Sequence, residues 1–322
     1  MQLTYRNFTP ADIDALVSFW NTQAAWDEVT REIWEHRFLK TPGGVPVIML
    51  AMHENTIAGQ FAFLPLQVQT GEKTVAGYRP FAIIVAKELR SHLRFLTMVN
   101  VLVTMYQKAV LEIKKTGASL IYALPNPAWV KALRALPEAH LFSFPLWSVP
   151  LPLPNAFVLP QHYTLTVLTA ADTRIDALWE KGRKLYNCCA VRSAAMLQWR
   201  IKDQKYTVLG LEADGQLLGL SLSVSKKEDK QWLLCDMMAT SIEHLSLLVQ
   251  ATCLQAQQHA AAAPELQLKK VAILATPALQ PLLAPLGFQK DAYRFPMLLQ
   301  ILDDSLSKET LAPESWYMSA ND

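Results

Sequence analysis

The clearest pattern along the chain is an apolar stripe between residues 95 and 115. Its members recur at steps of three and four: Leu96, Val99, Val103, Tyr106, Val110 and Ile113. This spacing predicts a long amphipathic helix. Residues 80–86, an apolar run of strand length, come before it, and residues 87–94 between them are polar and basic. A strand that delivers a basic loop to a helix N-terminus predicts an anion site, because backbone N–H groups and the helix dipole face one point.

The rest of the chain also shows helical spacing in some segments and strand-like apolar or alternating runs in others. Helical spacing predicts further helices in the first half over 12–23, 30–40 and 127–136. Apolar and alternating runs predict strands over 3–8, 45–52, 57–69, 74–85, 118–124 and 140–147. An early helix pair, an antiparallel meander and a strand–helix–strand unit indicate the α+β class, with a mixed, mostly antiparallel sheet flanked by helices.

A proline-rich segment lies near the middle of the chain, with Pro145, Pro150, Pro152, Pro154 and Pro160. Such a segment is extended and semi-rigid. A chain of 322 residues is also long for one domain. We therefore predict an N-terminal domain at 1–147, a linker at 148–160 and a C-terminal domain at 161–322.

Motifs of the first half recur in the second half. Ile13-Asp-Ala-Leu16 corresponds to Ile175-Asp-Ala-Leu178, and the segment 127–136 corresponds to 277–286, which also begins with Pro-Ala. Internal repetition of this kind predicts two like domains in tandem.

Composition narrows the classes of function. Apolar residues make up 51% of the chain, charged residues 18%, and the net charge is +2, which argues against disorder and a nucleic-acid partner. The four cysteines form no disulfide or metal pattern, so we expect reduced, buried thiols. The histidines lack metal-ligand spacing, and no metal is expected. No signal peptide or membrane-spanning run is evident, which predicts a cytoplasmic protein with no membrane partner; an oligomer stays possible.

Several motifs carry a family resemblance. They are Leu197-Gln-Trp-Arg200, Asp214-Gly-Gln-Leu-Leu-Gly219, Leu286-Gly-Phe288 and the tail Trp316–Asp322. With the order of elements, they resemble tandem-domain members of the GNAT (N-acetyltransferase) superfamily, some of which are encoded near bacterial polysaccharide genes. The resemblance spans nearly the whole chain. It implies an acyl-CoA-dependent N-acyltransferase with acetyl-CoA or another acyl-CoA as co-substrate, and an amine of a small molecule or an amino sugar as acceptor.

The resemblance also implies a coenzyme site in the first domain. The family's pyrophosphate loop, Arg/Gln-x-x-Gly-x-Gly/Ala, corresponds here to Arg90-Ser-His-Leu-Arg-Phe95, in which neither glycine is kept. Asn126 is expected to contact the coenzyme or to cap the helix beginning at Pro127. The full set of candidate coenzyme-binding residues is Ile84, Val85, Arg90, Ser91, His92, Leu93, Arg94, Phe95, Leu96 and Asn126.

Acyl transfer to an amine needs a base for the ammonium proton and an acid for the leaving thiolate. Glu28, beside Asp27 in the turn between the first two helices, either borders the acceptor site or is a first-turn acid of the next helix. Tyr122 is a candidate acid or a core residue. Asp236 lies in an apolar run, so it is either functional or held by hydrogen bonds.

Two other functions stay open. The missing glycines and the lack of a carboxylate on the strand over 80–86 favour a catalytically inactive tandem GNAT that binds a metabolite or a protein. Aminoacyl transfer from tRNA is a weaker alternative, because the near-neutral charge disfavours RNA binding. The second domain, which has no basic residue between Asp236 and the helix that follows, is expected to be structural or to form one wall of the substrate cleft.

Overall fold

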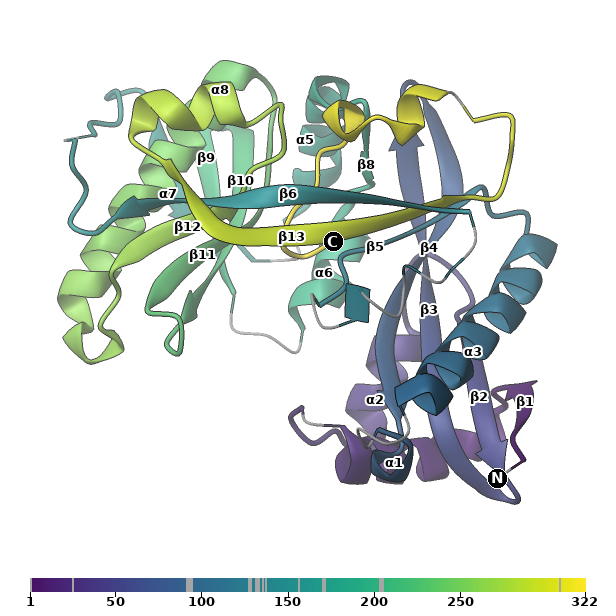
Figure 1. The fold of residues 1–322 in the computed structure, drawn as a ribbon. Helices are drawn as coiled ribbons and strands as arrows, with labels where there is room; N and C mark the ends of the chain where they lie inside the picture. The colour runs from purple at the N-terminus through teal and green to yellow at the C-terminus, as the bar shows by residue number, and fades with distance from the viewer. Residues whose placement is uncertain are drawn as a thin grey trace. The chain divides into compact units, whose positions relative to one another are not determined.

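The computed structural model describes the chain except for these residues: Met1, Ala25, 91–94, 127–128, 131–133, 135, 137, 156, 170–171, 203–205 and 307. The described chain divides into two compact units (Figure 1). Unit 1 comprises Met1–Val68, Thr74–Leu141 and Pro296–Leu306. Unit 2 comprises Gln69–Lys73, Phe142–Phe295 and Ser307–Asp322.

Unit 1 contains a sheet with the strand order β1-β2-β3-β4-β5-β13. The strands are β1 (Thr4–Asn7), β2 (Val47–His53), β3 (Thr56–Thr70), β4 (Lys73–Val85), β5 (Leu120–Ala123) and the second half of β13 (Gln289–Ile301). The pairs β1–β2, β2–β3 and β5–β13 are antiparallel, whereas β4 and β5 are parallel. Its described helices include α1 (Ile13–Gln23), α2 (Arg31–Leu39) and α3 (Phe95–Lys115).

Aromatic side chains hold the helices of unit 1 against its sheet. Phe61 and Phe63 of β3 stack with ring centroids 4.6 Å apart, and both contact Tyr106 of α3 at 5.9 and 5.6 Å. Phe38 of α2 lies 5.7 Å from Phe81 of β4. All but Phe81 are fully buried, so the central strands β3 and β4 are fixed by ring packing.

Unit 2 has the strand order β6-β12-β11-β10-β9-β7. The strands are β6 (Ala139–Pro150), β7 (Thr164–Val167), β9 (Thr207–Ala213), β10 (Gln216–Lys226), β11 (Gln231–Ala239) and β12 (Lys270–Leu274), with the short β8 (Cys188–Ala190) apart from them. The pair β11–β12 is parallel, and its neighbours β10–β11 and β6–β12 are antiparallel. The helices α5 (Ile175–Gly182) and α7 (Ile242–Ala262) pack on β10 and β11, and α6 (Ala194–Ile201) and α8 (Gln280–Leu283) complete the set.

The predicted elements agree well with the observed ones. The helix predicted at 95–115 is confirmed as α3, and α2 begins after Thr30, whose side chain accepts a hydrogen bond from the Ile33 amide at 3.3 Å. The α+β class is confirmed. All four cysteines are free and buried, as expected. The helix expected at 127–136 lies largely outside the described residues.

The compact units differ from a division of the chain at 148–160. Most of β6 belongs to unit 2, because it pairs with β12 from Leu146–Leu274 to Pro150–Lys270. The second half of β13 belongs to unit 1, because it pairs with β5. Each unit therefore contains strand residues from the other half of the sequence.

Candidate active site

The unit 1 sheet is irregular where β4 and β5 separate. These parallel strands pair at Gly77–Leu120 and Tyr78–Ile121, and β4 then continues to Val85. Within this continuation Ala82 has φ of 53°, and its carbonyl accepts a hydrogen bond from the Gln60 amide side chain at 3.3 Å. A non-glycine residue in the left-handed region costs about 1–2 kcal/mol, and such strain concentrates at functional sites.

A cavity of about 420 Å³ lies at this separation, entirely within unit 1. Helices α1, α2 and α3, strands β3, β4 and β5, and the residues after β5 all contribute to its wall. The lining residues are Trp20, Trp26, Asp27, Arg37, Phe61, Pro80, Phe81, Ala82, Ile83, Tyr106, Ala123, Leu124, Pro125, Asn126, Trp129 and Leu298. The wall is thus mainly aromatic and aliphatic, which is typical of a small-molecule site.

Three side chains bring charge or amide groups to this wall: Asp27, Arg37 and Asn126. The loop that carries Asp27 is held from both sides. The indole nitrogen of Trp20 donates to the Asp27 carbonyl at 3.0 Å, and the Asn21 side chain bonds both the amide and the carbonyl of Val29 at 2.8 and 3.0 Å. These bonds fix the backbone of the loop on which Asp27, an exposed residue of the cavity wall, lies.

Tyr106 contributes the buried end of the cavity. Its hydroxyl donates to Oε1 of Gln300 at 2.7 Å, and burial raises the pKa of Tyr106 above its ordinary value. The hydroxyl therefore stays protonated, and it fixes the ring of Tyr106 against the Phe61 and Phe63 pair.

The predicted catalytic residues belong to both compact units. Glu28 is exposed on the loop of unit 1 next to the cavity residue Asp27. Tyr122 is fully buried in β5 and is not one of the described residues that line the cavity. Asp236 belongs to unit 2. Of the two in unit 1, Glu28 follows the cavity residue Asp27 and Tyr122 precedes the cavity residue Ala123, but neither is among the described lining residues.

The predicted coenzyme residues also divide. Asn126 lines the cavity, whereas Ile84 and Val85 are buried in β4 just beyond Ile83. Arg90 is exposed, and its Nη2 donates to the carbonyl of Gln23 at 2.6 Å. The remaining predicted residues are Ser91, His92, Leu93 and Arg94, which lie outside the described residues, and Phe95 and Leu96, which begin α3.

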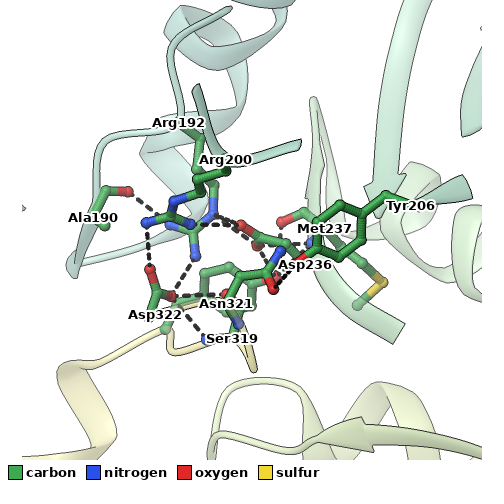
Figure 2. Close-up of polar contacts among 10 residues, drawn as sticks. Ala190, Arg192, Arg200, Tyr206, Asp236, Met237, Ser319, Asn321 and Asp322 are labelled. Carbon is green, nitrogen blue, oxygen red and sulfur yellow. Dashed lines mark hydrogen bonds and ion pairs between the residues drawn. The ribbon is translucent and has the colours of Figure 1, made fainter. Parts of the chain in front are cut away.

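Asp236 takes part in a buried charge cluster in unit 2 (Figure 2). Arg192 donates through Nε to the Asp236 carboxylate at 2.9 and 3.1 Å and through Nη2 to Asp322 at 2.9 Å. Arg200 approaches both carboxylates, at 3.7 Å from Asp236 and 3.3 Å from Asp322. The Ser319 amide and hydroxyl each donate to Asp322 at 2.9 Å. Two arginines thus balance two carboxylates away from water.

The pKa values of the two carboxyl groups in the cluster are shifted in opposite directions. Burial raises the pKa of Asp236 against the opposing effect of Arg192. Burial also acts on Asp322, but Arg192 and Arg200 outweigh it, so the pKa of Asp322 lies below its ordinary value. The cavities beside the cluster measure only about 20 and 10 Å³. Such spaces admit about one water molecule, which suits a structural network rather than a substrate site.

The tail residues 316–319 fill the part of unit 2 where its parallel pair ends. The last register pair of β11 and β12 is Leu234–Ile273. The small cavity beyond it is lined by Tyr317, Met318 and Ser319 together with both strands. Tyr317 donates to the Met237 carbonyl at 2.8 Å, and Met318 is fully buried.

Sequence reasoning missed the aromatic wall. The sequence does not mark Trp20, Trp26 and Trp129 as site residues, yet all three line the cavity, and Trp26 is 52% exposed. The one signal was the break at 27–30, which places acids directly after a tryptophan. The described residues contain no group of three or more His, Cys, Asp or Glu side chains that could hold a metal ion. Among the described helices, none has the length and apolar character needed to cross a membrane.

The fold is similar to those of several solved structures. A GCN5-related N-acetyltransferase from Anabaena variabilis matches with TM-score 0.69 and 14% identity over 94% of this chain and 73% of that chain. One from Kribbella flavida matches with TM-score 0.63 and 14% identity over 94% and 71%. Saccharomyces cerevisiae N-myristoyltransferase with bound myristoyl-CoA matches with TM-score 0.56 and 13% identity over 93% and 79%.

These similarities confirm the predicted resemblance at the level of the fold. The chain has the fold of the GCN5-related N-acetyltransferases, the GNAT superfamily. No protein-family model matches the sequence, and no curated protein matches it.

Proposed function

We propose that this protein is an acyl-CoA-dependent N-acyltransferase whose reaction takes place in the cavity of unit 1. One observation carries the proposal: in a GNAT fold, the parallel strands β4 and β5 separate at a cavity, and a strained residue of β4, Ala82, lines it. A strand that leaves its partner has backbone groups available for a ligand. The co-substrate proposed is acetyl-CoA, and the acceptor is an amine of a small molecule or an amino sugar.

The residues of the cavity fit the two ends of such a reaction. The thioester would lie along β4 near Ala82, with the amide side chain of Asn126 as a hydrogen-bonding partner of the coenzyme. Backbone N–H groups of β4 would polarise the carbonyl. The amine would enter at the Asp27 side, where an ammonium group meets a carboxylate.

The chemical step follows from this placement. The ammonium group first gives one proton to a loop carboxylate, that of Asp27 or its neighbour Glu28, which frees the nitrogen lone pair. The neutral amine then attacks the thioester carbon, a C–N bond forms and the C–S bond breaks. The second nitrogen proton passes through water at the mouth to the thiolate, which leaves as the thiol. We assign no acid role to Tyr122, because this side chain is fully buried. Unit 2 has a structural role in this proposal.

Titration calorimetry with acetyl-CoA tests the proposal. The wild-type protein is expected to bind with a dissociation constant in the range of about 1–100 μM. Ala123→Phe, which places a ring in the cavity, should weaken binding at least about tenfold. Leu111→Phe is the matched control, because Leu111 is 61% exposed on α3. Both variants should keep a cooperative thermal transition. Equal binding by Ala123→Phe would place the coenzyme elsewhere.

A second function has its own supporting observation. The segment that corresponds to the family's pyrophosphate loop keeps neither glycine, having Leu93 and Phe95 in their places. Side chains there restrict the approach of phosphates to the backbone. This favours a catalytically inactive GNAT fold that binds a metabolite or a protein. The same titration separates the two, because absence of heat at millimolar acetyl-CoA would support the inactive protein.

A further inference from the structure

The wall of the cavity in unit 1 differs sharply between its apolar and polar parts. Aromatic rings come from α1, α3, β3 and β4 and from the segments at residues 26 and 129; they belong to Trp20, Trp26, Phe61, Phe81, Tyr106 and Trp129. The polar side chains described on the same wall are Asp27, Arg37 and Asn126. A ligand of this cavity therefore meets mainly aromatic and aliphatic side chains and a few charged or amide groups.

Trp26 is the most unusual of these rings. It is 52% exposed, yet it contacts the buried ring of Trp20 with centroids 5.1 Å apart and an interplanar angle of 50°. An exposed indole at the rim of an apolar cavity marks a binding surface. The ring adds contact area with little conformational entropy to lose, because it has two side-chain torsions.

The carboxylate of Asp27 follows Trp26 directly in the chain. The bond from the Trp20 indole nitrogen to the Asp27 backbone carbonyl, 3.0 Å long, fixes the backbone of Asp27 beside Trp20, whose ring also contacts Trp26. Arg37 contacts the same cluster, with its guanidinium carbon 5.9 Å from the Trp20 ring centroid. A carboxylate beside indole faces suits a cation, since both attract positive charge.

We propose that the acceptor is a primary amine carried by a flat aromatic body, an arylalkylamine, with its ring on Trp26 and its ammonium group toward Asp27. This inference rests on the proposed function and names the substrate class of the same site. Trp26 is then a specificity-determining residue, which binds the acceptor without taking part in proton transfer.

Within the acceptors of the proposed function, the wall composition favours an aromatic amine over an amino sugar. An amino sugar carries several hydroxyl groups, and the described wall offers few polar side chains to replace the hydrogen bonds that these groups make to water. An aromatic amine matches both the rings and the charge.

Steady-state kinetics with acetyl-CoA and three amines test this inference. The wild-type protein should show kcat/KM for 2-phenylethylamine at least about tenfold above those for hexylamine and glucosamine. Trp26→Ala should raise KM for 2-phenylethylamine about tenfold with little change in kcat, and should change KM for hexylamine and acetyl-CoA less than about threefold. Tyr293→Ala, which removes a 44% exposed ring in unit 2, is the matched control and should change nothing.

Direct titration keeps this inference separate from the proposed function. Calorimetry with 2-phenylethylamine alone should show binding to the wild-type protein and weaker binding to Trp26→Ala, whether or not acetyl transfer occurs. Acetyl-CoA binding with a preference for glucosamine would overturn the acceptor class while leaving the acyltransferase intact. Absence of amine binding, or equal loss for all three amines in Trp26→Ala, would also overturn it.

Discussion

Replacement of Arg192 by methionine should destabilise unit 2 strongly. Methionine keeps most of the buried aliphatic volume but removes the guanidinium that bonds Asp236, Asp322 and the Ala190 carbonyl at 2.7–3.1 Å. It also removes the contact of that group with the Tyr317 ring, whose centroid lies 4.6 Å away. Two buried carboxylates would then share Arg200 alone.

The expected loss follows from these contacts. Removing one partner of a buried ion pair costs about 3–5 kcal/mol, because the charge left behind has lost its hydration. Arg200 stays within 3.7 Å of one carboxylate and 3.3 Å of the other, which points to the lower part of this range, about 3–4 kcal/mol. For a unit of this size, about 2–4 °C of Tm corresponds to 1 kcal/mol, so Tm should fall by roughly 6–16 °C.

Thermal and urea unfolding followed by circular dichroism measure the change. Arg174→Met is the matched control, because Arg174 pairs with Asp172 and Glu212 at 2.7 and 3.0 Å but is 37% exposed. Exposed pairs contribute about 0–1 kcal/mol, so Tm should fall by less than about 4 °C. A fall below about 2 °C for Arg192→Met would refute the view that the cluster stabilises unit 2. Acetyl-CoA binding at low temperature should be equal in both variants.

Three further predictions concern backbone strain, pH and thiol reactivity. Ala82 has φ of 53°, a conformation that a β-branched side chain disfavours. Ala82→Val should therefore lower the free energy of unfolding in urea by about 1–2 kcal/mol, whereas Ala82→Gly should not lower it. Equal free energies of unfolding for the two variants would contradict backbone strain at this residue. Hydrogen bonds from Arg6 hold the pKa of Asp12 well below its ordinary value in the folded protein. The ion pair therefore stabilises the fold fully at pH values above about 4, the pKa of Asp12 in the unfolded chain. This stabilisation is lost as the pH falls from there toward the lower pKa of the folded state. The deficit of Asp12→Asn should therefore be smaller at pH 2 than at pH 7; an equal deficit would show that the ion pair is irrelevant. Burial raises the pKa of Cys188 to about 11, and all four cysteines are buried, so Ellman's reagent at pH 8 should label none within minutes and all four in guanidinium.

The sequence predicted those parts of the fold that local pattern determines. The stripe in α3 and the meander of β2, β3 and β4 depend on side-chain period alone, so their bounds were close to those observed. The assignment of most of β6 to unit 2 and of the second half of β13 to unit 1 was not predictable, because pairing between strands more than a hundred residues apart leaves no local signal. The prediction of two like domains in tandem remains a prediction.

The candidate site was predictable only in outline. Asn126 and the turn with Asp27 and Glu28 were identified as candidate site residues, because a strand end and an acidic turn are visible in the sequence. The role of Trp26 was missed, since helical spacing does not show whether a cavity lies behind a ring. Asp236 was correctly noted as an unusual acid, but its partner Arg192 lies 44 residues away and could not be identified from sequence.

The second half of β13, which completes the unit 1 sheet, has a consequence for folding during synthesis. The segment Pro296–Leu306 belongs to unit 1, where Leu298–Ile301 pairs with β5 along Leu120–Ala123. A ribosome produces the chain from its N-terminus, so β5 emerges long before its partner strand. Until about residue 306 has been made, that edge of the unit 1 sheet stays open to other strands. Nascent chains are therefore most vulnerable to aggregation before the last strand is released, and shortened N-terminal fragments retain this vulnerability permanently.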